Sequence, residues 1–284
     1  MLLSATNLTS AQIAAVTVAG TPGVNVRSCP ALDCDVLAIA HLGESLTPTG
    51  NSESGFTPVN FNGVNGYAFS LYLVAPGQDL WFRQGQPGCQ RVALMFNIVV
   101  GYEPSVSIVD TLISTGTAAT MFPMGYFASD YPGYTQRLND AGFAIGTHGQ
   151  DMVYMTELGP DQIKWDVNTS LEVIAGVTGN EPEPLFTPYA SDTSPFVRSV
   201  VASLGVLPVG RNVAAIDYTW TATEDSVYSD VLNNVYDGAI VELHLDAPAT
   251  SSSTALALPR IIADLTAQGY TFVTIPDMIL PCGN

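Results

Sequence analysis

The chain has 284 residues, of which 47% are apolar, and a formal net charge of −18 from 26 acidic and 8 basic residues. This length allows one large domain, or a large and a small one, with a sizeable core. The acidic composition excludes nucleic-acid binding, because phosphate backbones would be repelled. No apolar run approaches the eighteen or so residues that span a membrane. We therefore expect a soluble, non-membrane-spanning protein.

The four cysteines fall as a close pair, Cys29 and Cys34, and a remote pair, Cys89 and Cys282. No Cys-x-x-Cys motif occurs, so the sequence does not indicate a zinc or redox site. The pairs predict two disulfides and an oxidising, extracellular or cell-surface location. Residues 1–20 lack the basic start and unbroken apolar stretch of a secretory leader, so no signal peptide is predicted there.

Residues 13–75 consist of short apolar runs separated by turn residues, and Asn62-Gly63 and Asn65-Gly66 are hairpin signals. This pattern predicts a small all-β barrel. The phrases VNVRS, VLA and GYA, which begin at residues 24, 36 and 66, resemble the bacterial Src-homology-3-type domain. The resemblance implies attachment to cell walls or peptides. Residues 76–88 are rich in proline and glycine and predict a linker.

From residue 89 to 284, strand-like runs alternate with helical stretches, which is typical of β/α units. The first run, VALMFNIV at 92–99, carries a polar Asn97 near its carboxyl end, where such folds place their sites. Later helices are predicted over 105–114, 134–141, 161–177 and 258–268. Later strands are predicted over 119–122, 142–148, 185–189, 206–209, 238–244 and 270–275.

The phrases VALMFNIV, ATMF, GFAIGTH and ELH resemble, in order, the VALTFDDG, ATFF, GHEIGNH and LLH phrases of the polysaccharide deacetylase (NodB-type, carbohydrate esterase family 4) domain. The resemblance covers residues 89–280. It implies an α/β fold, a distorted β/α barrel that follows the small all-β barrel. Active members bind a divalent metal through one aspartate and two histidines, use a second aspartate as base, and use a late histidine as acid.

The metal-binding positions of that family map onto Ile98, His148 and Met152. Isoleucine has no donor atom, and a thioether is a poor ligand for zinc or hard cations. One ligand of three remains, with Asp151 as a substitute that could shift inward. We therefore expect no metal or other cofactor.

The base position carries Asn97, whose neutral amide cannot take a proton. The arginine that pairs with this base in the family is replaced by Thr187. Asp217 and His244 match the family's aspartate and late histidine, and they would remain as a dyad without its metal and base. The resemblance thus implies a degenerate catalytic centre.

Four aromatic side chains are candidate platforms for sugar rings: Tyr154, Tyr189, Tyr218 and Trp220. The favoured interpretation is a secreted, catalytically inactive deacetylase-like protein that binds cell-wall glycan, peptidoglycan or another N-acetylated polysaccharide. A second interpretation is a metal-dependent deacetylase with an unusual site, using His244 as acid. A third is a structural subunit of an extracellular assembly or filament, and the sequence leaves a homo-oligomer open.

Overall fold

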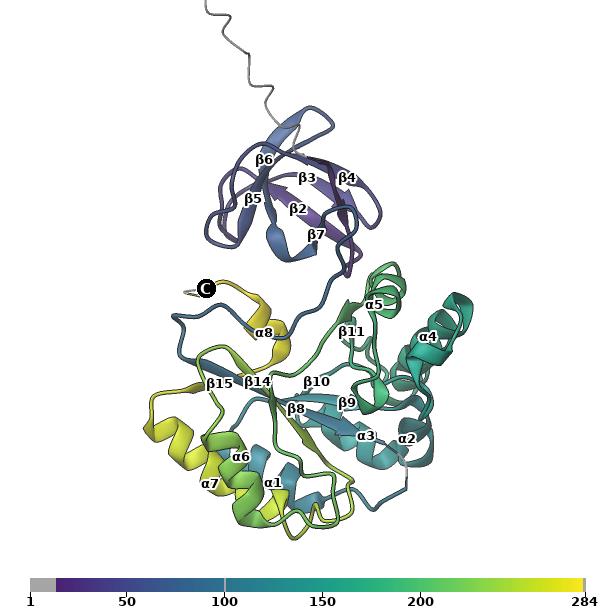
Figure 1. The fold of residues 1–284 in the computed structure, drawn as a ribbon, viewed down its shortest axis with the longest axis vertical. Helices are drawn as coiled ribbons and strands as arrows, with labels where there is room; N and C mark the ends of the chain where they lie inside the picture. Colours follow the sequence, from purple (N-terminus) through teal and green to yellow (C-terminus); the bar gives the residue numbers. More distant parts are fainter. Residues whose placement is uncertain (1–13, 100, 283–284) are drawn as a thin grey trace, which may run out of the picture. The chain divides into compact units, whose positions relative to one another are not determined.

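The computed structural model describes residues 14–99 and 101–282, and the chain divides into two compact units (Figure 1). The first unit comprises residues up to Val18 together with Gly23–Gln78, and the second comprises Ala19–Pro22 and the chain from Asp79 onward. The predicted first residue of the small domain, residue 13, and the last two of the large domain lie outside the described residues. Residues 1–13, part of the segment 1–20 in which no signal peptide is predicted, also lie outside the described residues.

The first unit is an antiparallel sheet of seven strands in the order β3-β2-β6-β5-β4-β1-β7. Alternate residues point into a small apolar core, as Val24 and Val26 of β2 do. No pairing in the described part of the chain joins β3 to β7, so closure into a barrel stays a prediction. The strands are β1 (Val16–Val18), β2 (Gly23–Arg27), β3 (Val36–His41), β4 (Ser45–Pro48), β5 (Phe56–Phe61), β6 (Val64–Phe69) and β7 (Leu73–Val74), with a 3₁₀ turn η1 (Ser70–Tyr72).

The two hairpin signals of this unit have different outcomes. Asn62 and Gly63 both have positive φ, 51° and 88°, and form the tight turn between β5 and β6. Gly66 instead lies inside β6, so the second predicted turn is wrong. A Cβ at Gly66 would come within 2.6 Å of the Arg27 carbonyl oxygen, so glycine is needed there for the close approach of β2.

The second unit is an α/β domain built on a parallel sheet of order β10-β9-β8-β14-β13, with β15 paired to the start of β8. Strand β8 is buried from Val92 to Ile98, as expected of a central parallel strand covered on both faces. A separate parallel pair joins β11 to β12. The strands are β8 (Arg91–Ile98), β9 (Thr120–Pro123), β10 (Ala144–Ile145), β11 (Leu185–Phe186), β12 (Leu207–Pro208), β13 (Val213–Ala214), β14 (Ala239–His244) and β15 (Thr271–Val273).

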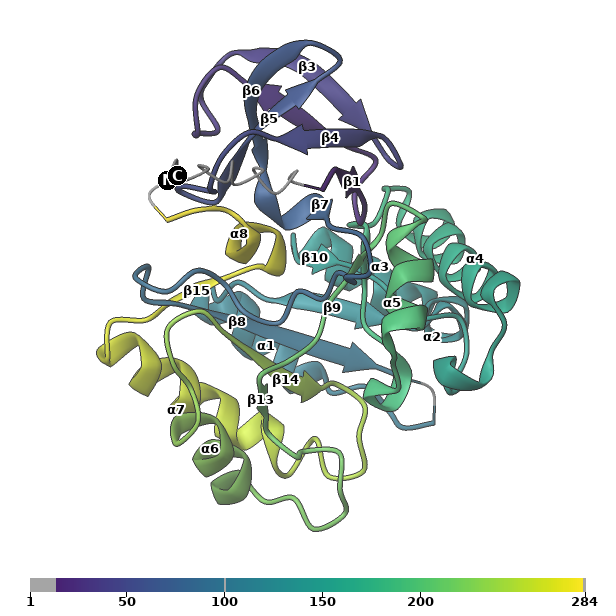
Figure 2. The same cartoon turned by 45° about the horizontal axis from the view of Figure 1, so that its top comes forward.

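Seven of the described helices of the second unit form two groups, α1, α6 and α7 in one and α2 to α5 in the other, and α8 contacts β8 (Figures 1 and 2). Helix α4 begins with a proline at its first position and ends at Gly179 in the left-handed conformation. None of the described helices is long and apolar enough to cross a membrane. The helices are α1 (Val106–Thr115), α2 (Gly125–Asp130), α3 (Pro132–Asp140), α4 (Pro160–Thr178), α5 (Pro195–Ala202), α6 (Glu224–Leu232), α7 (Thr254–Ala267) and α8 (Ile275–Ile279), with 3₁₀ turns η2 (Met155–Glu157) and η3 (Tyr189–Ser191).

The structure differs from the predicted linker over 76–88. From Asp79 onward this stretch belongs to the second unit, where Phe82 pairs with Val209 and Gln84 pairs with Ala239. Phe82 is 7% exposed. A free linker would leave such an apolar side chain in water, so this segment is packed. The proline and glycine content therefore marks a change of direction here rather than a flexible connection.

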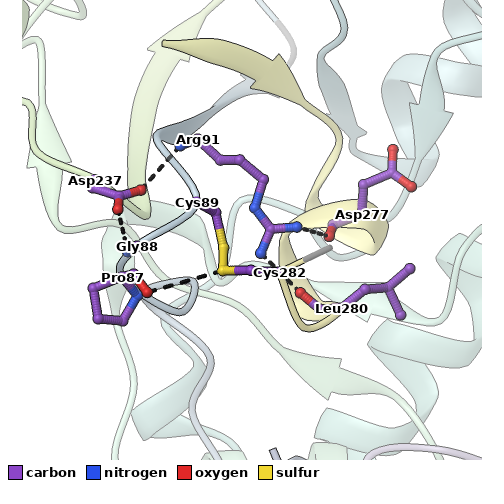
Figure 3. Close-up of a disulfide and its surroundings, with 8 residues drawn as sticks. All are labelled: Pro87, Gly88, Cys89, Arg91, Asp237, Asp277, Leu280 and Cys282. Atoms are coloured by element: carbon purple, nitrogen blue, oxygen red, sulfur yellow. Dashed lines mark hydrogen bonds between the residues drawn. A yellow bond between two sulfur atoms is a disulfide. The ribbon is translucent and has the colours of Figure 1, made fainter. Parts of the chain in front are cut away.

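The structure joins both predicted cysteine pairs as disulfides. The bridge between Cys89 and Cys282 fastens the end of the described chain to the start of β8 (Figure 3). Arg91 reinforces the same attachment, because its guanidinium donates to the carbonyl oxygens of Asp277 at 3.0 Å and Leu280 at 2.8 Å. Strand β8 is thus fixed at its amino end by a covalent bond and a charged side chain.

Candidate functional site

A cleft of about 340 Å³ opens at the carboxyl ends of β8 and β14. Asn97 of β8 and His244 of β14 are paired residues in this parallel ladder. Because paired residues point to the same face of a sheet, both side chains enter the cleft. The lining residues are Asn97, Val99, Tyr102, His148, Tyr189, Ala190, Ser191, Arg211, Tyr218, Glu242, His244, Asp246, Ala247 and Pro248.

His244 is oriented by the fully buried Asp217. Its Nδ1 lies 2.8 Å from Asp217 Oδ1, while Oδ2 accepts the His244 main-chain N–H at 2.9 Å and the Thr254 hydroxyl at 2.7 Å. Burial acts to lower the pKa of His244, but the charge and hydrogen bond of Asp217 outweigh it, and the net shift is upward. Nε2 is therefore the ring nitrogen that His244 offers to the cleft.

Glu242 places a second carboxylate in the cleft and is held by two donors. Asn97 Nδ2 donates to its Oε1 at 2.9 Å, and Arg211 Nη1 lies 2.9 Å from its Oε2. Burial raises the pKa of Glu242, and the Arg211 guanidinium opposes this shift. Arg211 also donates to the Ser191 hydroxyl. The pair thus occupies the side of the cleft next to Asn97.

His148 is buried, and its Nδ1 lies 2.8 Å from the carbonyl oxygen of Thr187. A carbonyl oxygen only accepts, so Nδ1 carries the proton and Nε2 is left as an acceptor. Burial, followed by the nearby His244, lowers the pKa of His148 to about 3. His148 is therefore neutral at physiological pH.

The three residues that the sequence resemblance assigns to metal positions do not fit a divalent metal. Ile98 is fully buried in the main apolar core, and Met152 is 50% exposed; neither lines the cleft. Asp151, the predicted substitute ligand, does not line it either. Across residues 14–99 and 101–282, no group of three or more His, Cys, Asp or Glu side chains is arranged to hold a metal. No step through a metal follows from this donor set.

Two buried acceptors of the cleft lack hydrogen-bond partners within the described residues: Asn97 Oδ1 and Asp246 Oδ2. Asn97 is 2% exposed and Asp246 is fully buried. The other carboxylate oxygen of Asp246 accepts the Val99 main-chain N–H at 3.1 Å. Burial raises the pKa of Asp246 to about 7. Unsatisfied buried acceptors of this kind call for a partner from outside the chain.

The backbone around the cleft is strained at three residues other than glycine. Ala190, Ser191 and Ile216 have φ of 51°, 56° and 49°. Two of them line the cleft, and Ile216 precedes Asp217. Such conformations cost about 1–3 kcal/mol each and persist where the surroundings impose them, commonly at functional sites.

Comparison with known proteins agrees with this geometry. The model of the family described as polysaccharide deacetylase matches residues 84–209. The peptidoglycan-N-acetylmuramic acid deacetylase PdaA of Bacillus subtilis is 30% identical over 181 residues, which are 63% of this chain and 66% of that protein, just under two thirds. Its solved structure, a family 4 carbohydrate esterase, superposes with a TM-score of 0.65 at 26% identity, over 70% of this chain and 84% of that one.

The second unit thus has the fold of the polysaccharide deacetylase domain, and residues 84–209 match that family. A family 4 carbohydrate esterase pseudoenzyme from Bacillus anthracis shares its fold, with a TM-score of 0.65 and 22% identity over 74% of this chain and 76% of that one. The family match ends at residue 209, before Arg211, Asp217, Glu242 and His244. The β14 side of the cleft therefore lies beyond the family match.

Aromatic side chains surround the cleft of the deacetylase domain. Tyr189 and Tyr218 line it directly, and the Tyr218 ring lies 5.5 Å from the His244 ring. Tyr154 contacts Tyr189, with 6.0 Å between ring centroids, and Trp220 contacts Tyr102 at 5.9 Å. Trp220 is 75% exposed, so its ring is presented to solvent at the rim.

The structure brings five of the residues singled out from the sequence together as lining residues: Asn97, His148, Tyr189, Tyr218 and His244. Asp217 and Thr187 support two of these from behind. Tyr154 and Trp220 lie one ring contact away, whereas Ile98 and Met152 lie outside the lining.

Sequence reasoning gave no role to Glu242, Arg211 or Asp246 of the deacetylase domain. Glu242 and Asp246 stand two residues before and two after His244, so the period of a strand places Glu242 on the same face, and this signal was available. Arg211 lies between β12 and β13 and reaches Glu242 only through the fold.

Proposed function

We propose that the deacetylase domain binds a cell-wall glycan, peptidoglycan or another N-acetylated polysaccharide, without deacetylating it. The observation that carries this proposal is the placement of Ile98 in the core and of Met152 outside the cleft, which leaves His148 without partner ligands. The metal that would activate a water has no donor set here. The cleft and its aromatic side chains nevertheless remain, as a sugar-binding surface requires.

The names of two relatives support a glycan as the ligand of this domain. The similar proteins of Bacillus subtilis and Bacillus cereus are named as deacetylases of peptidoglycan N-acetylmuramic acid and N-acetylglucosamine. The fold also occurs in a protein described as a pseudoenzyme, so loss of catalysis is compatible with keeping the architecture. In our proposal the catalytic centre is also degenerate because Asn97 stands at the base position and Thr187 stands at the arginine position.

The first unit fits the same role. We assign residues 13–75 to a bacterial Src-homology-3-type barrel that attaches the protein to the wall, and residues 89–284 to the deacetylase domain. The antiparallel sheet supports the assignment of the first unit. The two disulfides support an extracellular or cell-surface location, because such bonds persist in oxidising environments.

The proposal is tested by measuring binding and hydrolysis on the same preparation. We expect the protein to sediment with purified peptidoglycan and to release no acetate from it, with or without added zinc or cobalt. Metal content by elemental analysis is expected to stay near zero after incubation and desalting. Acetate release with one metal per chain would replace this proposal with the metal-dependent deacetylase.

Variants locate the binding surface. Tyr189→Ala removes a lining ring and is expected to weaken binding at least about tenfold, because stacking and ring burial are lost. Tyr126→Ala is the control, since this tyrosine is 51% exposed on α2 and does not line the cleft. Equal binding by both variants would place the glycan elsewhere. Light scattering on the same samples tests the alternative of an assembly-forming subunit.

A further inference from the structure

The cleft contains acceptors that lack partners. Glu242 is a carboxylate that mainly accepts, so its bond from Asn97 fixes the Asn97 amide with Nδ2 toward Glu242, and Oδ1 is left buried without a partner among the described residues. Asp246 Oδ2 is the second acceptor without a partner in the described chain. The neutral ring of His148 supplies a third acceptor, Nε2.

Several N–H donors that line the cleft are already engaged. Arg211 Nη1 is used by Glu242 and Ser191, and His148 Nδ1 is used by the Thr187 carbonyl. His244 Nδ1 is used by Asp217, and its Nε2 donates only when the ring is protonated. An acetamide would bring a carbonyl oxygen, and the described residues hold no group of ligands arranged for a metal that could polarise it.

From this arrangement we propose that the cleft selects a glycan unit with a free amine, a de-N-acetylated hexosamine, whose ammonium donates to Asn97 Oδ1 and Asp246 Oδ2. This inference rests on the proposed glycan-binding function and names the sugar that is held. An ammonium has three donors and a positive charge, so it satisfies both buried acceptors at once.

Charge favours the same ligand. Glu242 and Asp246 line the cleft with Asp217 behind them, and Arg211 stands against these three acidic residues. The formal charge of −18 adds an attraction for cations over the whole chain. The adjacent rings of Tyr189 and Tyr218 supply apolar faces for a sugar, which a simple diamine or a lysine side chain would leave unused.

The test compares two ligands on the intact protein by isothermal titration calorimetry at pH 7 and about 150 mM salt, an ionic strength that screens exposed charges. The ligands are the tetramer of glucosamine and the tetramer of N-acetylglucosamine. We expect the free-amine tetramer to bind at least about tenfold more tightly. Tetralysine, with the same number of side-chain ammonium groups, controls for attraction to the acidic surface and is expected to bind weakly.

Asp246→Asn tests the assigned contact. Its amide oxygen can keep the bond from Val99, which turns the NH₂ group toward the cleft and replaces an acceptor by a donor. We expect this variant to lose about tenfold or more in affinity for the glucosamine tetramer and not for the acetylated one. Asp110→Asn removes a carboxylate that lies outside the cleft lining and is expected to bind like the unchanged protein.

The outcomes separate the two proposals. The inference would be overturned if the protein preferred the acetylated tetramer, or if tetralysine bound as tightly as the glucosamine tetramer. In either case the proposed glycan binding would still be decided by the sedimentation experiment with peptidoglycan. Unchanged affinity of a folded Asp246→Asn variant would overturn it as well. If neither tetramer nor peptidoglycan binds, the proposed function itself fails. The comparison of ligands needs no variant, so it stands even if Asp246→Asn does not fold.

Discussion

At the scale of single residues, the cleft has a buried ion pair that the family resemblance does not lead one to expect. The sequence lacks an aspartate at Asn97 and an arginine at Thr187, yet Glu242 and Arg211 place a carboxylate and a guanidinium next to Asn97. Glu242 is 6% exposed, so its charge needs these donors. The site therefore has a charged pair beside Asn97, formed by Arg211 and Glu242.

Replacing Arg211 with methionine should destabilise the second unit. Arg211 is partly exposed and Glu242 is buried, so we expect a loss of about 2 kcal/mol, between the values for exposed and buried pairs. Arg137→Met, at the more exposed pair with Asp110, is the control and should cost about 0.5 kcal/mol or less. Both are measured by urea unfolding.

The effect of Arg211→Met should depend on pH. The pKa of Glu242 is raised in the fold, so the folded state holds the proton more tightly, and the contribution of Glu242 to stability is largest below pH 4.5 and falls as the pH rises. Without Arg211 the pKa rises further. The destabilisation should be present at pH 7 and disappear near pH 4; a constant loss would show that Arg211 acts through packing.

The three histidines of the chain allow a second test at this scale by NMR titration. We expect the pKa of His244 to lie above 6.5 and that of His148 near 3. His244 then stabilises the fold below pH 6.5 and loses this contribution as the pH rises through its folded pKa. His148 has the opposite sign, since stability is lost as the pH falls from 6.5 toward 3.

Asp217→Asn should lower the pKa of His244, because burial would then be opposed only by the charges of Glu242 and Asp246. Thr254→Val keeps the Asp217 carboxylate and removes only a hydroxyl, so the pKa of His244 should stay above 6.5. If His244 titrates below 6.5 in the unchanged protein, the orienting role of Asp217 is wrong.

At the scale of elements, helix α7 (Thr254–Ala267) continues through Pro259, which has no N–H to donate to the Ala255 carbonyl. Pro259 is exposed. Pro259→Ala restores a helix hydrogen bond, and we expect a gain of about 1–2 kcal/mol in the free energy of unfolding, measured with urea. Pro195→Ala is the control, because Pro195 is the first residue of α5, where no bond is lost; an equal gain there would point to a general effect of proline.

The same proline shows where sequence patterns stop being informative. The predicted helix began at 258, whereas α7 begins at Thr254, because tertiary packing of Ala257 and Leu258 holds the turn before Pro259. Strongly periodic elements were predicted within a residue or two: α1 and α4 match 105–114 and 161–177. Helix α6 was missed, since only Val227 and Val231 of its nine residues are buried and no clear apolar period remains.

The residues of the site could be predicted where the sequence contains phrases that resemble the deacetylase family. Asn97 and His244 meet in the cleft because their strands pair in register, as a β/α fold requires. Arg211 and Asp246 belong to no sequence phrase that resembles the family. Their roles depend on contacts across the fold, which composition and residue spacing do not reveal. The strand predicted over 142–148 is shorter in the structure, where β10 is Ala144–Ile145, although Gly146 and His148 still donate main-chain N–H groups to Met121 and Pro123 of β9.

At the scale of the whole molecule, the two disulfides differ in the length of chain they close, 5 against 193 residues of separation. In the chain-entropy model, removing the long one by Cys89→Ala with Cys282→Ala should cost about 5 kcal/mol, and removing Cys29–Cys34 should cost about 2 kcal/mol. Calorimetry of both double variants checks this. Equal losses would show that strain or local contacts, and not chain entropy, dominate.

The bridge from Cys89 to Cys282 also turns most of the second unit into a covalent ring, with the first unit attached to it as a tail. A single peptide-bond cut inside the ring leaves one connected molecule, whereas a cut between residues 23 and 78 separates the pieces unless it falls between Cys29 and Cys34. A single cleavage between Gln78 and Cys89 thus breaks the covalent link between the first unit and the ring, while at least two cleavages inside the ring are needed before any part of the cleft is released.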